Sequence, residues 1–226
     1  MKKDEPPPLG VFWECSQPAC GFRFVEAPLR GHPPPTRPCP RCGAPAVVEA
    51  TVPPPPPRSP TGEPPPPQVA VLLDNLRSAY NVGAAFRIAD AAGLRHLYLA
   101  GITPSPKHPG VGKTALGAQR AVPWSQHING VKLVATLQAQ GWAVWALETG
   151  STSRPLGEWL NTGVPSRLVL VVGNEVAGVD PAILQRADAV AALPMWGIKA
   201  SLNVATALAA AIYRVRATVS SSGASP

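Results

Sequence analysis

The sequence predicts an α/β domain with a mostly parallel sheet, joined by a proline-rich segment to a small unit built around four cysteines. Three observations indicate this arrangement. Apolar, β-branched runs alternate with helical patterns from residue 68 onward, all four cysteines stand before residue 43, and prolines are concentrated between the two parts. With 226 residues, of which 45% are hydrophobic, the chain is long enough for one full core and one small additional unit.

The cysteines form two pairs, Cys15 with Cys20 and Cys39 with Cys42. Two pairs separated by a loop can bring four soft thiolates together, as a tetrahedral zinc site requires. The second pair stands in CPRCG, where Gly43 permits the turn that directs backbone amides at a thiolate. The first pair is spaced more widely than a tight knuckle. We therefore predict a zinc ribbon over residues 1–50, with bound iron or a pair of disulfides as the alternatives.

Residues 51–67 hold two proline blocks and predict an extended polyproline linker, because proline supplies no backbone N–H for a helix or a sheet. The large domain is expected over residues 68–216. The tail, residues 217–226, is rich in serine and is expected to be disordered.

Strands and helices are expected to alternate along the large domain. Strands are expected at 69–73, 95–100, 143–147, 167–172 and 189–193. Helices are expected from Asn81 to Gly93, from Ala115, over 131–140, over 181–186 and from Ser201 to the end of the domain. Asn81 and Ser201 are predicted to cap the helices that they open, and Gly93 is predicted to end the first helix. Segments 102–114 and 151–155 are expected to be loops, and Trp124 is expected to lie in a turn.

The run at 167–172 is continuously apolar after its first residue, which is typical of a strand buried on both faces of a parallel sheet. Gly173 ends that strand with a backbone that a ligand can approach closely. The final helix is rich in alanine, which indicates a buried helix, and the PMWG loop before it offers a surface for a flat ligand. Strand exits at Gly173 and Leu193, each followed by a helix, predict a ligand crevice at the carboxyl ends of the strands.

The formal net charge of the chain is +7, and most of it belongs to the large domain. Residues 1–67 hold 7 Lys/Arg and 6 Asp/Glu, a net charge of +1, so the remaining 13 basic and 7 acidic residues give +6. This excess suits a polyanionic partner. Charges and prolines stand where a secretory signal would be apolar, and the longest apolar run, 202–213, is too short to cross a bilayer. We expect a cytoplasmic protein that does not enter the membrane.

Two glycine patterns imitate nucleotide sites. GVGKT at 110–114 has the end of a phosphate loop, but Lys107 stands where that loop needs its first glycine, and no strand directly precedes it. GNEVAG at 173–178 lacks the spacing of a dinucleotide fingerprint. The patterns therefore argue against ATP and NAD, and against an α/β oxidoreductase.

Three blocks stand in order along the large domain: NLRSAYNVGAAFRIADAAG at 75–93, LVLVVGNEVAGVD at 168–180 and LPMWGIKASLNVATALAAAIY at 193–213. With their N-x-G-x-x-x-R, G-x-E-x-x-G and S-L-N-V elements, they resemble the three motifs of the SpoU/TrmH branch of the SPOUT RNA ribose 2'-O-methyltransferases. The resemblance covers residues 68–216. It implies a SPOUT-type parallel sheet with a C-terminal deep trefoil knot, bound S-adenosylmethionine, a homodimer and an RNA substrate.

The resemblance also implies the site residues. The methyl donor would be held by Leu147, Thr149, Gly173, Leu193 and Leu202. The family's active-site positions fall on Asn81, Arg87, Glu175, Ser201 and Asn203. The implied reaction is an in-line attack of a ribose 2'-hydroxyl on the sulfonium methyl group. Because a guanidinium is a poor proton acceptor, we expect Arg87 to grip a phosphate and to stabilise the developing alkoxide.

Several alternatives stay open at this point. The RNA is either tRNA or rRNA, and no DNA substrate is expected. Lys107, Lys113 and Arg120 are either phosphate contacts or an ordinary solvated surface. The ribbon is expected to recruit or orient RNA, with a protein partner as the alternative. A catalytically silent, knotted RNA-binding module is the alternative to an enzyme, although every active-site position keeps the residue that the family has there.

Overall fold

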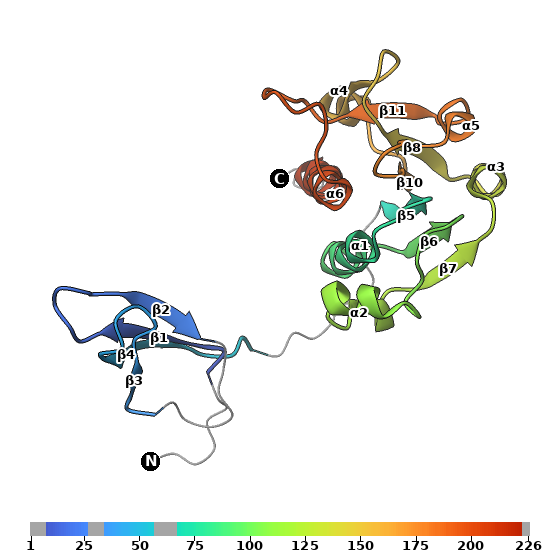
Figure 1. Ribbon diagram of the computed structural model, residues 1–226. Helices are drawn as coiled ribbons and strands as arrows, with labels where there is room; N and C mark the ends of the chain where they lie inside the picture. The colour runs from blue at the N-terminus through green and yellow to red at the C-terminus, as the bar shows by residue number, and fades with distance from the viewer. Residues whose placement is uncertain (1–7, 27–33, 57–66, 223–226) are drawn as a thin grey trace. The chain divides into compact units, whose positions relative to one another are not determined.

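The computed structural model describes residues 8–26, 34–56 and 67–222, and the chain divides into two compact units, Met1–Thr61 and Gly62–Pro226 (Figure 1). Within the predicted linker, Thr51 and Val52 belong to a strand, and residues 57–66 lie outside the described residues. In the described part of the chain, no helix combines the length and the apolar character that a bilayer crossing requires.

The first unit is an antiparallel sheet with the strand order β2-β1-β4-β3. Its strands are β1 (Gly10–Cys15), β2 (Arg23–Glu26), β3 (Thr36–Pro38) and β4 (Pro45–Val52). Its small buried core is formed by Val11, Trp13, Cys15, Cys39 and Ala46. Gly43 has a φ of 77° and makes the turn expected of it, and Gly21, with a φ of 51°, makes the matching turn after the first cysteine pair.

The second unit contains a seven-stranded sheet in the order β7-β6-β5-β10-β8-β11-β9, and every neighbouring pair is parallel. The strands are β5 (Gln68–Asp74), β6 (His96–Ala100), β7 (Trp124–His127), β8 (Ala143–Leu147), β9 (Arg154–Pro155), β10 (Arg167–Val172) and β11 (Ala189–Ala192). The predicted α/β class with a parallel sheet is confirmed. The trefoil knot stays a prediction.

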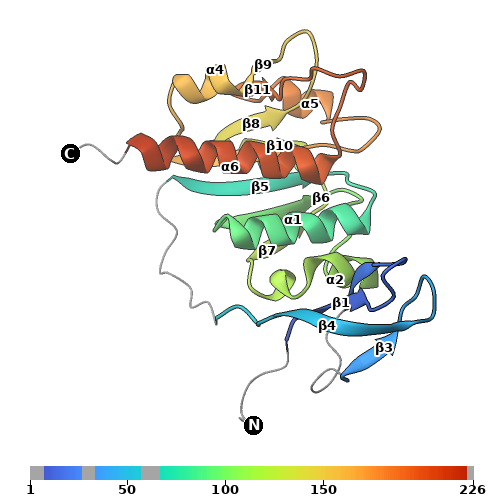
Figure 2. The same ribbon diagram turned by 90° about the vertical axis from the view of Figure 1, so that its left-hand side faces the viewer.

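Helices cover both faces of this sheet, as expected when parallel strands are joined by crossovers (Figures 1 and 2). One face carries α1 (Ala79–Ala91), α2 (Pro109–Ala115), α4 (Leu156–Asn161) and α6 (Val204–Ser222), together with a 3-10 turn, Ala118–Arg120. The other face carries α3 (Gly130–Ala139) and α5 (Pro181–Leu184). Helices α1 and α6 lie side by side, so the first and last helices of the unit meet on one face.

The structure corrects two predicted helix starts. Helix α1 is capped by Ser78, whose Oγ accepts a hydrogen bond from the N–H of Asn81 over 3.3 Å, so Asn81 lies inside the helix. Helix α6 begins at Val204, and Asn203 rather than Ser201 provides the cap. Its Oδ1 accepts hydrogen bonds from the N–H groups of Ala205 and Thr206, at 3.0 and 3.3 Å. Both caps lie within two or three residues of the free N–H groups, as capping requires.

Other differences fall in short or polar segments. Helix α2 begins inside the expected loop 102–114 and ends at Ala115, where a helix was expected to start. It begins early because His108 Nδ1 caps the N–H of Gly110 and Pro109 suits a first turn. Strands β7 and β9 and helix α4 were not predicted. Helix α6 continues to Ser222, six residues into the segment predicted to be disordered, since Val215 packs in the core and anchors its last turns. Residues 223–226 lie outside the described residues.

Arg216 ties the last helix to two other parts of the unit. Its guanidinium donates hydrogen bonds to the carbonyl oxygens of Pro67, Ala92 and Gly93, at 2.9, 3.0 and 2.7 Å. These bonds join α6 to the segment before β5 and to the end of α1. The pKa of Arg216 is lowered because the guanidinium is partly buried.

Candidate active site

A cavity of about 520 Å³ opens where β8, β10 and β11 end. Its walls come from the residues that follow these three strands and from the loop before α6. All five residues expected at the methyl donor line it, namely Leu147, Thr149, Gly173, Leu193 and Leu202. The cavity has the size of a small-molecule site, for which about 300–1,000 Å³ is typical. The ligand crevice predicted from the strand exits is present at that place.

The loop that follows β10 folds back on the strand end. Asn174 and Gly178 exchange two backbone hydrogen bonds of 2.9 Å, which close a tight hairpin. A Cβ atom at Gly173 would overlap the backbone of Gly178 and Val179, so this close return requires glycine at position 173. The hairpin carries Glu175 toward the start of α1.

Glu175 binds the N-terminal end of α1 with both carboxylate oxygens. Oε2 accepts the N–H of Arg77 at 2.9 Å, and Oε1 accepts the N–H of Ser78 at 3.0 Å and the side-chain amide of Asn81 at 2.9 Å. Burial alone would raise the pKa of Glu175, but these hydrogen bonds outweigh it, and the pKa is lowered from its ordinary value of 4.5. A negative charge at a helix N-terminus is also favoured by the helix dipole.

Asn81 links this carboxylate to the start of α6. The side-chain amide of Asn203 donates a hydrogen bond to Asn81 Oδ1 at 3.1 Å, while Asn203 Oδ1 caps α6. Glu175, Ser201 and Asn203 line the cavity, and Asn81 bonds to two of them. Four of the five residues expected in the active site are therefore brought together.

Arg87, the fifth, does not line this cavity. It lies on the exposed side of α1, beside a second, open cavity of about 570 Å³ that also includes Tyr213 of α6. Within one described chain, the guanidinium is thus separated from the other four residues.

Glu148 is a cavity residue that the sequence analysis did not single out. Its Oε1 accepts the N–H of Thr149 at 2.8 Å, and its Oε2 accepts the N–H of Val179 at 2.9 Å. The signal available in the sequence is a carboxylate placed directly after the buried strand β8. Among the described residues that line the cavity there are two carboxylates, Glu148 and Glu175, and neither lysine nor arginine. Such an interior favours a positively charged ligand.

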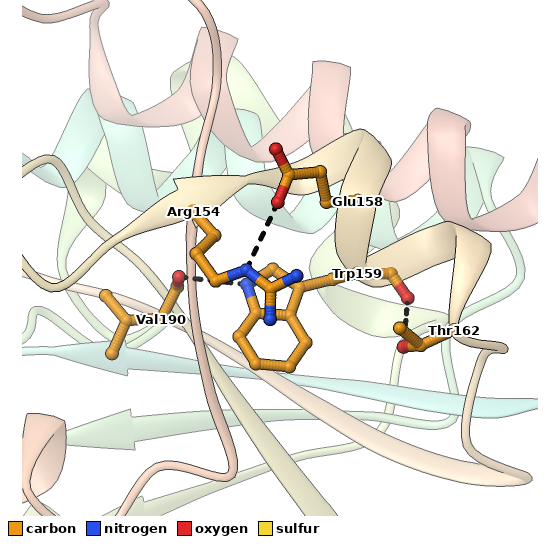
Figure 3. A network of polar contacts seen from close by, with 5 residues as sticks. All are labelled: Arg154, Glu158, Trp159, Thr162 and Val190. Carbon is orange, nitrogen blue, oxygen red and sulfur yellow. Dashed lines mark hydrogen bonds and ion pairs between the residues drawn. The ribbon is translucent and has the colours of Figure 1, made fainter.

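The segment that brings Glu148 and Thr149 to the cavity is fixed at its far end (Figure 3). The guanidinium carbon of Arg154 lies 4.6 Å from the ring centroid of Trp159, and Arg154 Nε contacts Glu158 Oε2 at 3.1 Å. Trp159 Nε1 donates a hydrogen bond to the carbonyl oxygen of Val190 at 3.1 Å, which ties α4 to β11. These contacts hold the end of the loop between β8 and α4 against β11.

In the first unit, the four predicted metal ligands form one cluster, because all four sulfur atoms lie within 4.8 Å of one another. The Sγ atoms of Cys15 and Cys42 are 3.5 Å apart, and those of Cys20 and Cys39 are 4.0 Å apart. Tetrahedral zinc with Zn–S bonds of about 2.3 Å requires S···S separations of about 3.8 Å. The donor set fits zinc, and no two of the four cysteines are joined as a disulfide in this arrangement.

The basic residues expected near the site lie outside the cavity. Lys107 precedes α2, Lys113 belongs to α2, and Arg120 belongs to the 3-10 turn, and all three are exposed. Both interpretations of these residues, as phosphate contacts or as an ordinary surface, stay predictions.

The model of the SpoU rRNA Methylase family matches residues 68–213. The 23S rRNA (guanosine(2553)-2'-O)-methyltransferase RlmP of Bacillus subtilis is 32% identical over 148 residues, which cover 65% of this chain and 57% of that protein. The 23S rRNA (guanosine-2'-O-)-methyltransferase RlmB of Vibrio parahaemolyticus is 32% identical over 138 residues, covering 61% and 54%. The chain thus spans little more than half the length of these curated relatives.

Solved structures share the fold of the second unit. An AdoMet-bound rRNA methyltransferase from Sinorhizobium meliloti superimposes with a TM-score of 0.61 and 28% identity, over 69% of this chain and 58% of that chain. The TrmH/SpoU tRNA-modifying enzyme of A. aeolicus gives a TM-score of 0.62 and 28% identity, over 71% and 80%.

Proposed function

The chain belongs to the SpoU rRNA methylase family, and from this premise we propose that it transfers a methyl group from S-adenosylmethionine to a ribose 2'-hydroxyl of rRNA or tRNA. The hydrogen-bonded series Glu175–Asn81–Asn203 carries the proposal, because it assembles residues of all three motifs at the mouth of one cavity. Two similar proteins are named 23S rRNA 2'-O-methyltransferases, and a structural neighbour is named a tRNA-modifying enzyme.

The cavity suits this methyl donor in size and in charge. Backbone groups of Gly173, Leu193 and Leu202 would hold the donor, with Leu147 and Thr149 completing the wall. The carboxylates of Glu148 and Glu175 favour a cation inside. When bound, S-adenosylmethionine supplies a methyl group activated by a positively charged sulfur, which becomes neutral once the methyl group has left.

Each asparagine of this series keeps one side-chain N–H that the network does not use. Each side-chain NH₂ group has two hydrogens, and the network uses one on Asn81 for Glu175 and one on Asn203 for Asn81. The second N–H of Asn203 is available to the 2'-oxygen, where it stabilises the negative charge that develops as this oxygen attacks the methyl group and its proton passes to solvent water. Ser201, on the same rim, supplies a further hydroxyl for the ribose.

We further propose that a homodimer completes the site. Arg87 lies away from the cavity of its own chain, so the expected contact with a phosphate at the reacting nucleotide requires the cavity of a second copy. Helices α1 and α6 offer a surface for that copy. Tyr213 and Leu116 border the same open cavity as Arg87 and are 51% and 70% exposed, and Tyr80 on the adjacent helix α1 is 56% exposed. Exposed apolar groups gathered in this way favour association.

The proposed function also suggests the compartment in which the protein acts and the role of the ribbon. The protein would act in the cytoplasm, where RNA is present and cysteines stay reduced for metal binding. The ribbon would recruit or orient the RNA, while the second unit performs the chemistry.

Methyl transfer tests the function directly. Wild type and Asn203→Ala are incubated with labelled S-adenosylmethionine and with tRNA or rRNA separately, followed by nucleoside mass spectrometry. A 2'-O-methylated nucleoside that wild type makes and the variant loses supports the proposal and names the RNA class. Label on a base would contradict the assigned chemistry. RNA binding without any label in either RNA would favour the silent RNA-binding module.

A further inference from the structure

Trp196 is exposed to an extent that is unusual for tryptophan. Its side chain is 90% exposed, Ile198 is completely exposed, and Lys199 beside them is exposed as well. The other five tryptophans of the chain are buried or half-buried, for example Trp13 and Trp145 at 0% and 4%. A large aromatic side chain left in water commonly marks a binding surface.

This exposed segment lies at the rim of the cavity. Met195 on one side of it and Ala200 on the other both line the cavity, so the segment Trp196–Lys199 stands between two lining positions. Trp196 directly follows the lining residue Met195, so its exposed side chain stands next to this part of the cavity wall.

We propose that Trp196 is a stacking platform for an unpaired base of the RNA, next to the nucleotide whose ribose enters the cavity. The proposal rests on the proposed function. A nucleotide that presents its 2'-hydroxyl to the cavity must place its base, or that of its neighbour, outside the mouth. An aromatic face there stabilises the base by stacking, whatever the base is.

The charge of the segment complements the same occupant. The loop 193–203 contains Lys199 and no acidic residue, and the large domain carries a net charge of +6 from 13 basic and 7 acidic residues. A cation and an aromatic ring exposed in the same loop suit a nucleotide, because a cation can contact its phosphate and a ring can stack on its base. The surface proposed for a second copy of the chain lies instead on α1 and α6, where Tyr80 and Tyr213 are exposed.

Fluorescence isolates this tryptophan, because it is the most accessible of the six. A short unstructured single-stranded oligoribonucleotide is added to the full-length protein, and acrylamide quenching of tryptophan emission is followed with and without it. We expect RNA to protect the acrylamide-accessible fraction, and the Trp196→Phe variant to lack that fraction from the start. A duplex of the same sequence should protect far less, since its bases are already stacked.

Binding of the same oligonucleotide, measured by fluorescence anisotropy, gives the energetic test. Trp196→Ala should weaken binding at least about fivefold, and Trp196→Phe should restore most of it, because stacking needs a ring rather than an indole. Ile128→Ala is the matched control, since Ile128 is 98% exposed, follows β7 and does not line the cavity. The proposal is overturned if Trp196→Ala binds the oligonucleotide as tightly as wild type does. It is also overturned if acrylamide protection rises with protein concentration in the absence of RNA, because that result assigns Trp196 to a contact between copies of the chain.

Methylation by wild type, run in parallel, separates the two proposals. If wild type methylates RNA while Trp196→Ala binds and reacts as wild type does, the stacking proposal is wrong and the function stands. If wild type transfers no methyl group to tRNA or rRNA, but RNA still protects Trp196 from acrylamide, the methyltransferase function is wrong and the stacking surface stands.

Discussion

The side-chain amide of Asn203 donates a hydrogen bond to Asn81 Oδ1 over 3.1 Å, although 122 positions of sequence separate the two residues. Asn203 caps the last helix, and Asn81 lies in the first helix of the same unit. The contact therefore connects the stability of α6 to the geometry of the cavity rim.

Asn203 has a role in capping α6 and a proposed role at the cavity rim, and a comparison with a second asparagine cap should separate the two. Asn203→Ala and Asn129→Ala each remove a helix cap, since Asn129 Oδ1 accepts the N–H of Lys132 at 2.9 Å. Both variants should lose about 1 kcal/mol of unfolding free energy in denaturant titrations. Only Asn203→Ala should also lose methyl transfer, by roughly tenfold or more. Equal activity losses in the two variants would assign Asn203 a purely structural role.

Glu175 should make the stability of the second unit depend on pH. Its pKa is lowered below 4.5 in the folded protein, so its stabilising contribution is present above pH 4.5 and is lost as the pH falls through the lowered value. Glu175→Gln should melt at a lower temperature than wild type at neutral pH. The gap should narrow as the pH falls below 4.5, as followed by circular dichroism. A gap that is constant over this range would show that the carboxylate charge is not what stabilises α1.

Glu148 should help the cavity to discriminate between donor and product. S-adenosylmethionine carries a positive charge on sulfur, and S-adenosylhomocysteine does not. Glu148→Gln keeps the shape but removes the negative charge, so calorimetry should show the affinity for S-adenosylmethionine falling roughly tenfold and that for S-adenosylhomocysteine falling much less. Equal losses for the two ligands would indicate that Glu148 acts only by holding Thr149 and Val179.

Metal removal should unfold the ribbon alone. Five buried residues form its core, which is too little for a sheet of this size to be stable without a staple. We expect one zinc per chain by elemental analysis, and a strong chelator or Cys39→Ser should remove it together with the signals of residues 8–26 and 34–56 in an amide NMR spectrum. The signals of residues 67–222 should persist. Retention of the ribbon signals in metal-free protein would contradict a structural role for the metal.

The exposed faces of α1 and α6 should mediate self-association. Tyr213→Glu places a charge on the proposed interface and should shift the protein toward monomer in light scattering coupled to size-exclusion chromatography. Val25→Glu, at a ribbon residue that is 57% exposed, controls for the added charge. If wild type is itself a monomer at the concentrations at which it is active, Arg87 must reach the reaction by another route.

Much of the fold follows from local sequence, and the misses have physical causes. Strands β8 and β10 have the predicted bounds because continuous apolar runs indicate buried parallel strands. The start of α1 was misplaced because Asn75, Ser78 and Asn81 are all plausible caps, and the choice is made by Glu175, 97 residues from Ser78. Strand β7, with the sequence WSQH, pairs at the edge of the sheet, where apolar alternation is not needed.

The site was more predictable in its membership than in its geometry. The motifs identify Asn81, Glu175 and Asn203, but the bonds that join them cross long sequence separations that no local pattern reveals. Glu148 was not singled out among residues 146–149, because a single carboxylate after a strand is a weak signal until the cavity is seen. Arg87 lies apart from the cavity because its side of α1 borders a second cavity, which Tyr213 of α6 helps to form. The sequence does not reveal this packing of α6 beside α1.

The three bonds from Arg216 to Pro67, Ala92 and Gly93 also bear on how the chain acquires its structure during synthesis. The last helix, α6, bonds to the beginning of the same unit, so the ribosome must translate nearly the entire unit before these bonds can form. Contacts between such distant positions delay folding, because a long loop must close before any stabilisation is gained. The nascent unit therefore spends its translation time incomplete, with the sheet face that α6 will cover accessible to chaperones.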